Sequence, residues 1–134
     1  MATLESSEGI GAAYAQKLRA VGVTTVEDLL KKGATPKGRQ EIAENSGISG
    51  KLVLRWVKHA DLFRIKGVGE EYADLLEASG VDTVVELAQR KAENLDQKMV
   101  ATNMEKKLVR KLPTQSQVAG WVAQANELPR VVTY

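Results

Sequence analysis

The sequence predicts an all-α protein made of two consecutive helical units, and three observations support this prediction. The composition is rich in helix-forming residues and includes only three prolines. A glycine-containing segment occurs twice in the chain, which indicates an internal duplication. No segment alternates apolar and polar residues as a strand does, and residues 131–134 are interpreted as a packed or loose terminus.

The duplication is visible in the sequence itself. The segment GIGAAYA at residues 9–15 recurs 58 residues later as GVGEEYA at residues 67–73. Further along the offset grows to 65, so the second copy contains about seven extra residues, around residues 105–113. We therefore expect a first unit at residues 1–64 and a second unit, with the C-terminal tail, at residues 65–134. Paired positions include Tyr14 and Tyr72, Leu18 and Leu76, Gly22 and Gly80, Leu29 and Leu87, and Trp56 and Trp121.

The first full helix of each copy is predicted directly after the repeated glycines. After Gly11, the residues Tyr14, Leu18 and Val21 recur at helical spacing and form one apolar face. Gly22 follows as the residue that ends this helix. The same pattern in the second copy predicts an equivalent helix there.

The next three helices of the first copy are predicted from their starting residues. Either Thr24 or Thr25 is expected to cap a short helix, and Thr35 followed by Pro36 opens another. Ser49 begins a helix with a long apolar stripe. The predicted core of the two units consists of Leu18, Leu29, Ile42, Val53, Trp56, Val57, Leu76, Leu87, Val118, Trp121 and Val122.

The composition argues against an enzyme or a metal-binding protein. The chain has no cysteine and a single histidine, His59, so we expect no metal site and no cofactor. We also find no nucleophile elbow, no phosphate-binding Walker loop and no other catalytic constellation, so we expect a protein without catalysis. The first residues lack the pattern of a secretory signal and no apolar run reaches membrane-spanning length, so we expect a soluble, cytoplasmic protein that binds no membrane.

Three glycine turns are the segments with the clearest functional chemistry. Two glycines flanking one apolar residue, or in one of the three cases Gly47 and Ser49 flanking Ile48, allow a tight turn and leave backbone N–H groups uncovered at the start of the next helix. Such a group of N–H donors, together with the helix dipole, suits a phosphate oxygen. We call residues 9–11 the first glycine turn, residues 47–49 the second, and residues 67–69 the third.

The first and third glycine turns, with the alanine and leucine that follow them, resemble the helix-hairpin-helix motif. Residues 9–60 resemble the N-terminal DNA-binding domain of archaeal and eukaryotic strand-exchange recombinases. The whole chain resembles an uncharacterised bacterial family of helix-hairpin-helix proteins of unknown function. The first of these resemblances implies non-catalytic, sequence-tolerant binding of duplex DNA through backbone phosphate contacts.

The charge distribution supports the same expectation for the first copy. Residues 31–66 hold nine basic and three acidic side chains, a net charge of +6, whereas residues 67–96 hold two basic and eight acidic ones, a net charge of −6. After the second glycine turn, Lys51, Arg55, Lys58 and His59 follow one another at helical spacing as a basic stripe. The predicted nucleic-acid-binding residues are Gly9, Gly11, Gly47, Ser49, Lys51, Arg55, Lys66, Gly67 and Gly69.

Several alternatives stay open on the sequence alone. Glu70 and Glu71 follow the third glycine turn and would repel a phosphate, so the first unit is expected to hold most of the DNA affinity. Ser7 stands where the motif expects an apolar residue. The first glycine turn would therefore be less well anchored, unless Leu4 supplies the apolar contact instead. The rival function is a protein-binding scaffold or adaptor that uses the acidic second unit or the tail, and a third is an accessory domain of an enzyme. Whether the partner is DNA, RNA or protein, and whether the chain forms oligomers, stays open.

Overall fold

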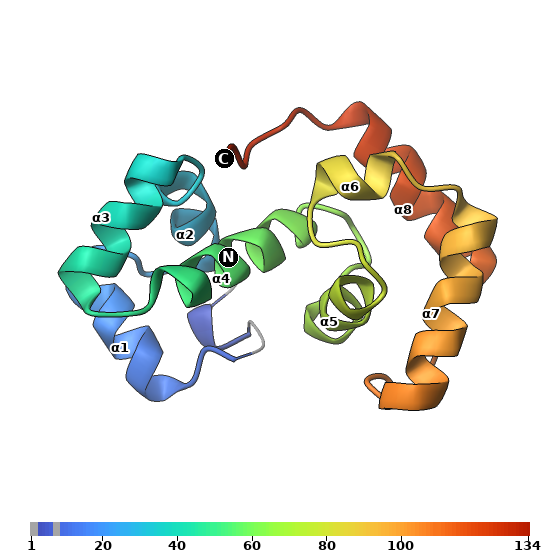
Figure 1. Cartoon of the computed structure of the whole chain (residues 1–134), viewed down its shortest axis with the longest axis horizontal. Coiled ribbons are helices and arrows are strands. Elements are labelled where there is room, and N and C mark those ends of the chain that lie inside the picture. Colours follow the sequence, from blue (N-terminus) through green and yellow to red (C-terminus); the bar gives the residue numbers. More distant parts are fainter. Residues whose placement is uncertain (1–2, 7–8) are drawn as a thin grey trace. The chain divides into compact units, whose positions relative to one another are not determined.

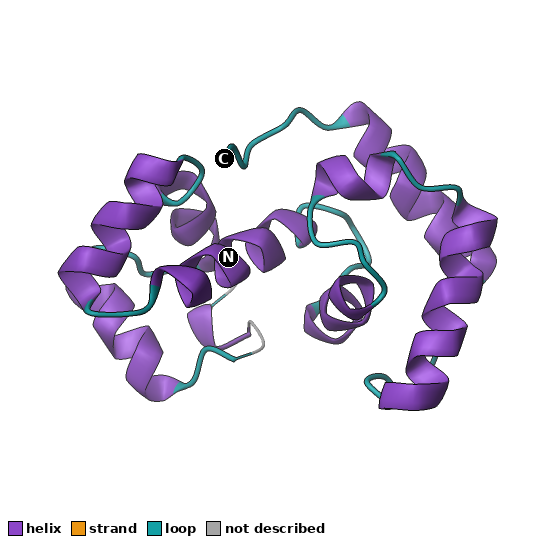
Figure 2. Cartoon of the chain, viewed as in Figure 1, coloured by secondary structure: helices purple, strands orange, loops and turns teal. Residues whose placement is uncertain are grey.

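The computed structural model describes residues 3–6 and 9–134 as helices joined by short loops (Figures 1 and 2). These residues contain no strand, and Thr3 and Thr25 form an isolated antiparallel bridge. No helix in the described part of the chain combines the length and the apolar character needed to cross a bilayer. The predicted all-α class is therefore confirmed.

The chain divides into two compact units. Unit 1 consists of residues 1–61 and 131–134, and unit 2 consists of residues 62–130. The two units differ from the sequence-based division mainly at the tail, which lies with unit 1 and not with unit 2. The elements of unit 1 are a short 3₁₀-helix at Leu4–Ser6 and the helices α1 (Ala12–Ala20), α2 (Val26–Lys32), α3 (Pro36–Ser46) and α4 (Gly50–Leu62), whose last residue is the first of unit 2.

The helix starts of unit 1 follow the predicted capping chemistry. The side chain of Thr25 accepts a hydrogen bond from the backbone N–H of Asp28, and that of Thr35 accepts one from Gly38. Thr25 is thus the cap of α2. The hydroxyl of Thr24 instead donates to the carboxylate of Asp28 at 2.6 Å, which holds the pKa of that carboxyl below its ordinary value.

The N-terminal segment of unit 1 is anchored by one apolar residue and one ion pair. Leu4 is fully buried in the core of the unit, which supplies the apolar anchor that the sequence places at position 4 or 7. Ser7 itself lies outside the described residues. Arg19 on α1 donates to both carboxylate oxygens of Glu5, at 2.7 and 3.0 Å, and this hydrogen bonding lowers the pKa of Glu5.

The C-terminal tail packs against α3 and the loop before it (Figure 1). Val132 is 3% exposed and belongs to the core of unit 1. The backbone N–H of Thr133 donates to the carbonyl of Ala34 at 2.8 Å. Arg39 on α3 donates to the carbonyl of Thr133 at 2.6 Å, and its burial lowers the pKa of its guanidinium. These contacts explain why the tail belongs to unit 1.

Unit 2 repeats the helical plan with a longer third helix. Its helices are α5 (Glu70–Ala78), α6 (Val84–Ala88), α7 (Ala92–Lys106) and α8 (Gln115–Glu127). Helix α8 contacts both α6 and α7 (Figure 1). It begins with a capping box, in which Thr114 and Gln117 each accept a hydrogen bond from the other's backbone N–H. The extra residues of the second copy form the last turn of α7 and the loop at residues 107–113.

Aromatic pairs occur at equivalent places in both units. The rings of Tyr14 and Trp56 in unit 1 have centroids 5.0 Å apart, and those of Tyr72 and Trp121 in unit 2 have centroids 5.3 Å apart. The Tyr14–Trp56 pair is edge-to-face, with an interplanar angle of 61°, and the Tyr72–Trp121 pair is tilted, at 51°. The two tyrosines thus occupy similar environments, which supports the duplication.

In each unit, a basic side chain also donates a hydrogen bond to the carbonyl of the glycine that follows the first helix. The ammonium of Lys32 donates to the carbonyl of Gly22, and the guanidinium of Arg90 donates to that of Gly80. Both glycines have a positive φ, +87° and +93°, which glycine adopts without strain.

In the predicted core, all the residues are buried except Val122, which is half-buried.

The tail is expected to contribute measurably to the stability of unit 1. Val132→Ala should lower the free energy of unfolding by about 2 kcal/mol, because it removes two buried methyl groups and leaves a cavity. Val131→Ala, at a half-buried position, should cost clearly less. Urea denaturation measures both, and hydrogen exchange at the Thr133 amide reports the bond to Ala34 directly. Equal effects of both variants, with rapid exchange at Thr133, would contradict this packing.

Candidate functional site

The helices of the protein begin in two chemically different ways. Helices α2, α3, α6 and α8 are each capped by a threonine side chain that accepts a hydrogen bond from a first-turn N–H group. Helices α1 and α5 begin at Gly11 and Gly69, where no side chain caps the N–H groups. Helix α7 also lacks a side-chain cap, but it starts at Lys91 without a glycine turn. The first and third glycine turns therefore present uncapped helix N-termini.

The two glycines of each turn have separate structural roles. Gly9 and Gly67 have φ values of +86° and +95°, in the region that favours glycine. Gly11 and Gly69 have ordinary φ values, and a Cβ atom on either would meet nothing within 4 Å. The apolar residue between the glycines is buried in both turns, as the motif requires. The second glycine thus leaves open space in front of the helix N-terminus.

An indole N–H group points at the first glycine of each turn. The Nε1 atom of Trp56 lies 3.5 Å from the position that a Cβ atom on Gly9 would take, and the Nε1 of Trp121 lies 3.0 Å from the same position on Gly67. The Trp56 N–H is buried and has no hydrogen-bond partner within the described residues. Both tryptophans are core residues, as predicted, but the sequence did not show that their polar edges face the turns. The sequence did contain one sign of this arrangement, because a tryptophan occurs at the equivalent position of both copies.

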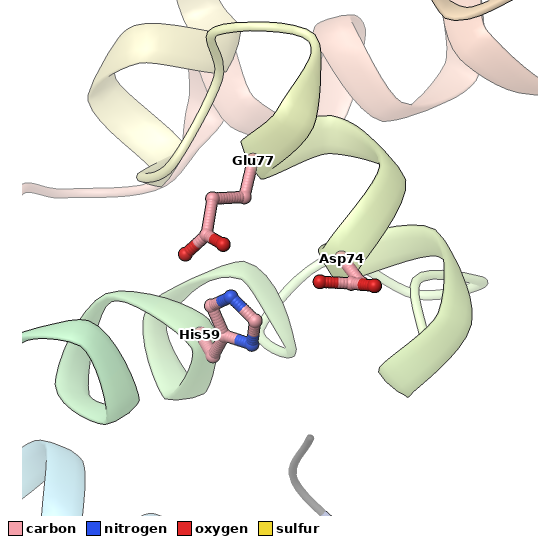
Figure 3. Close-up of side chains that lie close together, drawn as sticks. All are labelled: His59, Asp74 and Glu77. Atoms are coloured by element: carbon pink, nitrogen blue, oxygen red, sulfur yellow. The ribbon is translucent and has the colours of Figure 1, made fainter. Parts of the chain in front are cut away.

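The basic side chains of α4 only partly form the predicted stripe. Arg55 approaches the first glycine turn, with its Nη1 atom 3.7 Å from the Cβ position of Gly9. Lys51 is exposed and Lys58 is half-buried. His59, which also lies on α4 (Figure 3), is fully buried, so its placement in a surface stripe was wrong. Trp56 and Ala60 on the same helix are buried as well, so His59 belongs to the covered part of α4.

The second glycine turn differs from the other two in its hydrogen bonds. Gly47 ends α3 with a φ of +75°, and Ile48 is buried. The hydroxyl of Ser46 accepts a hydrogen bond from the N–H of Ile48, and that of Ser49 accepts one from Lys51. Serine side chains thus occupy two N–H groups that a ligand would otherwise use.

The third glycine turn faces a hollow of about 390 Å³. Two cations that the sequence analysis did not select, Arg110 and Lys111, line this hollow together with the turn. They come from the extra residues of the second copy. The many basic residues of that segment could have pointed to them. The residues that line the hollow are Gly67, Gly69, Glu70, Glu71, Tyr72, Arg110 and Lys111.

Lys66 does not join the third glycine turn's hollow, although it is next to it in sequence. Its backbone N–H donates to the side-chain oxygen of Gln124 at 2.9 Å, and its carbonyl accepts from the same amide at 3.2 Å. Lys66 instead lines a separate hollow with Arg64 and Glu127. Gly67 and Gly69 therefore line one hollow, and Lys66 lines another.

The acidic residues of α5 form only part of the charge of unit 2. Asp74 and Glu77 lie one turn apart on this helix (Figure 3), and both are half-buried. Residues 62–130 contain ten basic and ten acidic side chains, so unit 2 as a whole is neutral. The strongly acidic segment is thus balanced within its own unit.

Comparison with known proteins identifies a family but no characterised relative. Residues 8–128 match a family described as a domain of unknown function, DUF4332. Searches of curated proteins and of solved structures found no match. Because the matched region covers most of the 134 residues, the chain belongs to the DUF4332 family.

Proposed function

We propose that the protein binds nucleic acid, in the first place duplex DNA, without sequence preference and without catalysis. The observation that carries the proposal is the pair of uncapped helix N-termini at Gly11 and Gly69, each preceded by a glycine turn with an indole N–H at its first glycine. Backbone N–H groups at a helix N-terminus attract anions, because the helix dipole places partial positive charge there. A backbone phosphate is the anion that a nucleic acid offers to such a site.

Phosphate contacts of this kind explain binding that tolerates any sequence. They fix the position of a protein on a duplex but carry no base information. The resemblance of the glycine turns to helix-hairpin-helix motifs supports the same proposal, as does the resemblance of residues 9–60 to a recombinase DNA-binding domain. With few phosphate contacts per unit, we expect dissociation constants of roughly 10⁻⁴ to 10⁻⁶ M at physiological salt.

Cations near the first glycine turn would add long-range attraction. Arg55 lies beside Gly9, and Lys51 is exposed one turn earlier on α4. Within unit 1, residues 31–61 hold seven basic and three acidic side chains, a net charge of +4. An excess of positive charge raises the local concentration of a polyanion, and its effect falls as salt increases.

A substitution at Gly11 tests the proposed phosphate site without weakening the fold. Gly11→Asp places a good N-capping side chain at a position with open space and an ordinary φ of −81°. The carboxylate would occupy the helix N–H groups and repel a phosphate. We expect duplex affinity at low salt to fall about tenfold or more, because a charge-assisted hydrogen bond is worth ~1.5–3 kcal/mol. Helix stability should be unchanged or higher.

Thr35→Asp is the matched control for this experiment. It adds the same charge at the start of α3 in the same unit, where a side-chain cap is already present. Fluorescence anisotropy with a labelled duplex measures both variants. Equal losses of affinity in the two variants would show that net charge, and not the first glycine turn, governs binding.

Lys51 provides a second test, based on salt dependence. Lys51→Ala should lower the slope of log affinity against log salt concentration by about one unit, the effect of one lost phosphate contact. Lys51→Glu should weaken binding to all duplex sequences alike. The control is Lys37→Ala, an exposed lysine on α3 outside the glycine turns.

The same measurements separate DNA binding from the rival function. If the wild-type protein binds no duplex at low salt, or if Lys51→Glu leaves binding unchanged, the role of this site in nucleic-acid binding is refuted. A protein-binding scaffold or adaptor would then become the leading candidate. Single-stranded DNA and RNA of the same length, measured beside the duplex, identify the preferred polymer.

A further inference from the structure

We propose that Tyr134 is a stacking site for an unpaired base of a bound nucleic-acid strand. The proposed function uses backbone phosphates alone, and this inference rests on it for the class of polymer and adds a contact to a base. The site consists of the ring of Tyr134 and of two cations that lie over it, Arg39 and Lys58, and we call it the aromatic platform. All three residues belong to unit 1.

The ring of Tyr134 is open to a ligand. Tyr134 is 66% exposed, whereas the two tryptophans, Trp56 and Trp121, are buried in the cores of the units and cannot stack on a base. Within residues 3–6 and 9–134, the other large hydrophobic side chain that is exposed is Met104, on α7. Exposed aromatic rings bind bases by stacking, whatever the sequence of the strand.

The backbone next to Tyr134 is fixed to unit 1. Val132 lies in the core, and the backbone N–H of Thr133 donates to the carbonyl of Ala34 at 2.8 Å. The hydroxyl of Thr133 donates to the same carbonyl at 3.2 Å. An aromatic side chain on a fixed backbone loses less conformational freedom on binding than one on a loose terminus.

Arg39 holds the tail and also contributes charge to the aromatic platform. It is 8% exposed, and its Nη2 atom donates to the carbonyl of Thr133 at 2.6 Å. Its Nη1 atom donates to the carbonyls of Gly33 and Ala34, at 2.8 and 3.1 Å. The Cζ atom lies 5.9 Å from the centroid of the Tyr134 ring. Three hydrogen bonds therefore fix a positive charge beside the ring.

Lys58, on α4, provides the second cation. Its ammonium lies 5.5 Å from the centroid of the Tyr134 ring, within the distance at which a cation is attracted by an aromatic face. The ring stays 66% exposed with both cations in place.

An aromatic ring beside two cations matches the chemistry of a nucleotide. The flat base can stack on the ring, and the phosphate attached to it is attracted by the cations. An apolar protein surface would instead bury the two cations without a counter-charge, which is costly. Since bases in a duplex are already stacked on their neighbours, the ligand of the aromatic platform is an unpaired base.

Substitutions at Tyr134 test the aromatic platform in the full chain. Tyr134→Ala should weaken binding of a labelled oligothymidine of about 12 nucleotides roughly fivefold or more, the effect of one lost stacking contact. The slope of log affinity against log salt concentration should stay the same, because the ring carries no charge. Binding of a duplex of the same length should change much less. Fluorescence anisotropy measures all of these affinities.

Two control variants separate stacking from other effects. Tyr134→Phe keeps the ring and should keep the affinity for oligothymidine. Met104→Ala removes an exposed apolar side chain from unit 2 and should leave this affinity unchanged. An equal loss in Tyr134→Phe and Tyr134→Ala, or an equal loss in Met104→Ala, would overturn the proposal.

The outcomes also separate this inference from the proposed function. If Gly11→Asp weakens duplex binding but Tyr134→Ala binds oligothymidine like the wild type, the aromatic platform is refuted and the proposed function stands. If Tyr134→Ala weakens oligothymidine binding and Gly11→Asp leaves duplex binding unchanged, the aromatic platform stands and the phosphate site at the first glycine turn is refuted. A wild-type protein that binds neither DNA overturns both, and a protein partner becomes the leading candidate for Tyr134.

Discussion

In each unit, the indole of a buried tryptophan lies directly against the first glycine of a glycine turn. On Gly67 a Cβ atom would lie 3.0 Å from the Trp121 nitrogen, which is a tight contact, whereas on Gly9 it would lie 3.5 Å from the Trp56 nitrogen, which is an ordinary one. The positive φ of Gly67 adds a second reason for glycine there. The tyrosine that follows the turn then packs against the same indole, so one tryptophan sets the place of the turn and of the helix after it.

Most of the fold could be predicted because its determinants are local. A threonine cap, a proline at the start of a helix and an apolar stripe each act within a few residues, and the structure confirms them at Thr35, Pro36 and Trp56. The duplication extended this reasoning, because the positions paired by sequence make paired contacts in the two units. His59 was placed wrongly because helical spacing relates neighbouring positions but does not fix how much of a helix is covered.

The parts that the sequence did not predict depend on contacts between distant residues. Arg39 binds the carbonyl of Thr133, 94 positions later, and Tyr72 binds that of Lys111, 39 positions later. No periodicity or capping rule links such pairs, so neither the place of the tail nor the cations at the third glycine turn could be derived. The glycine turns themselves were predictable from spacing, but the residues that surround them were not.

The two units show how a duplicated scaffold can keep one geometry and change its electrostatics. The glycines, the uncapped helix and the indole are the same in both, because they depend on each other through direct packing. The cations are not constrained in this way, and they come from different elements. In unit 1, Arg55 on α4 approaches Gly9, whereas in unit 2 the loop at residues 107–113 brings Arg110 and Lys111 to the hollow at the third glycine turn. A charge acts over several ångströms, so a cation can be supplied from any nearby backbone position. A loop insertion can therefore offset the acidic residues of α5 without altering the turn that they follow.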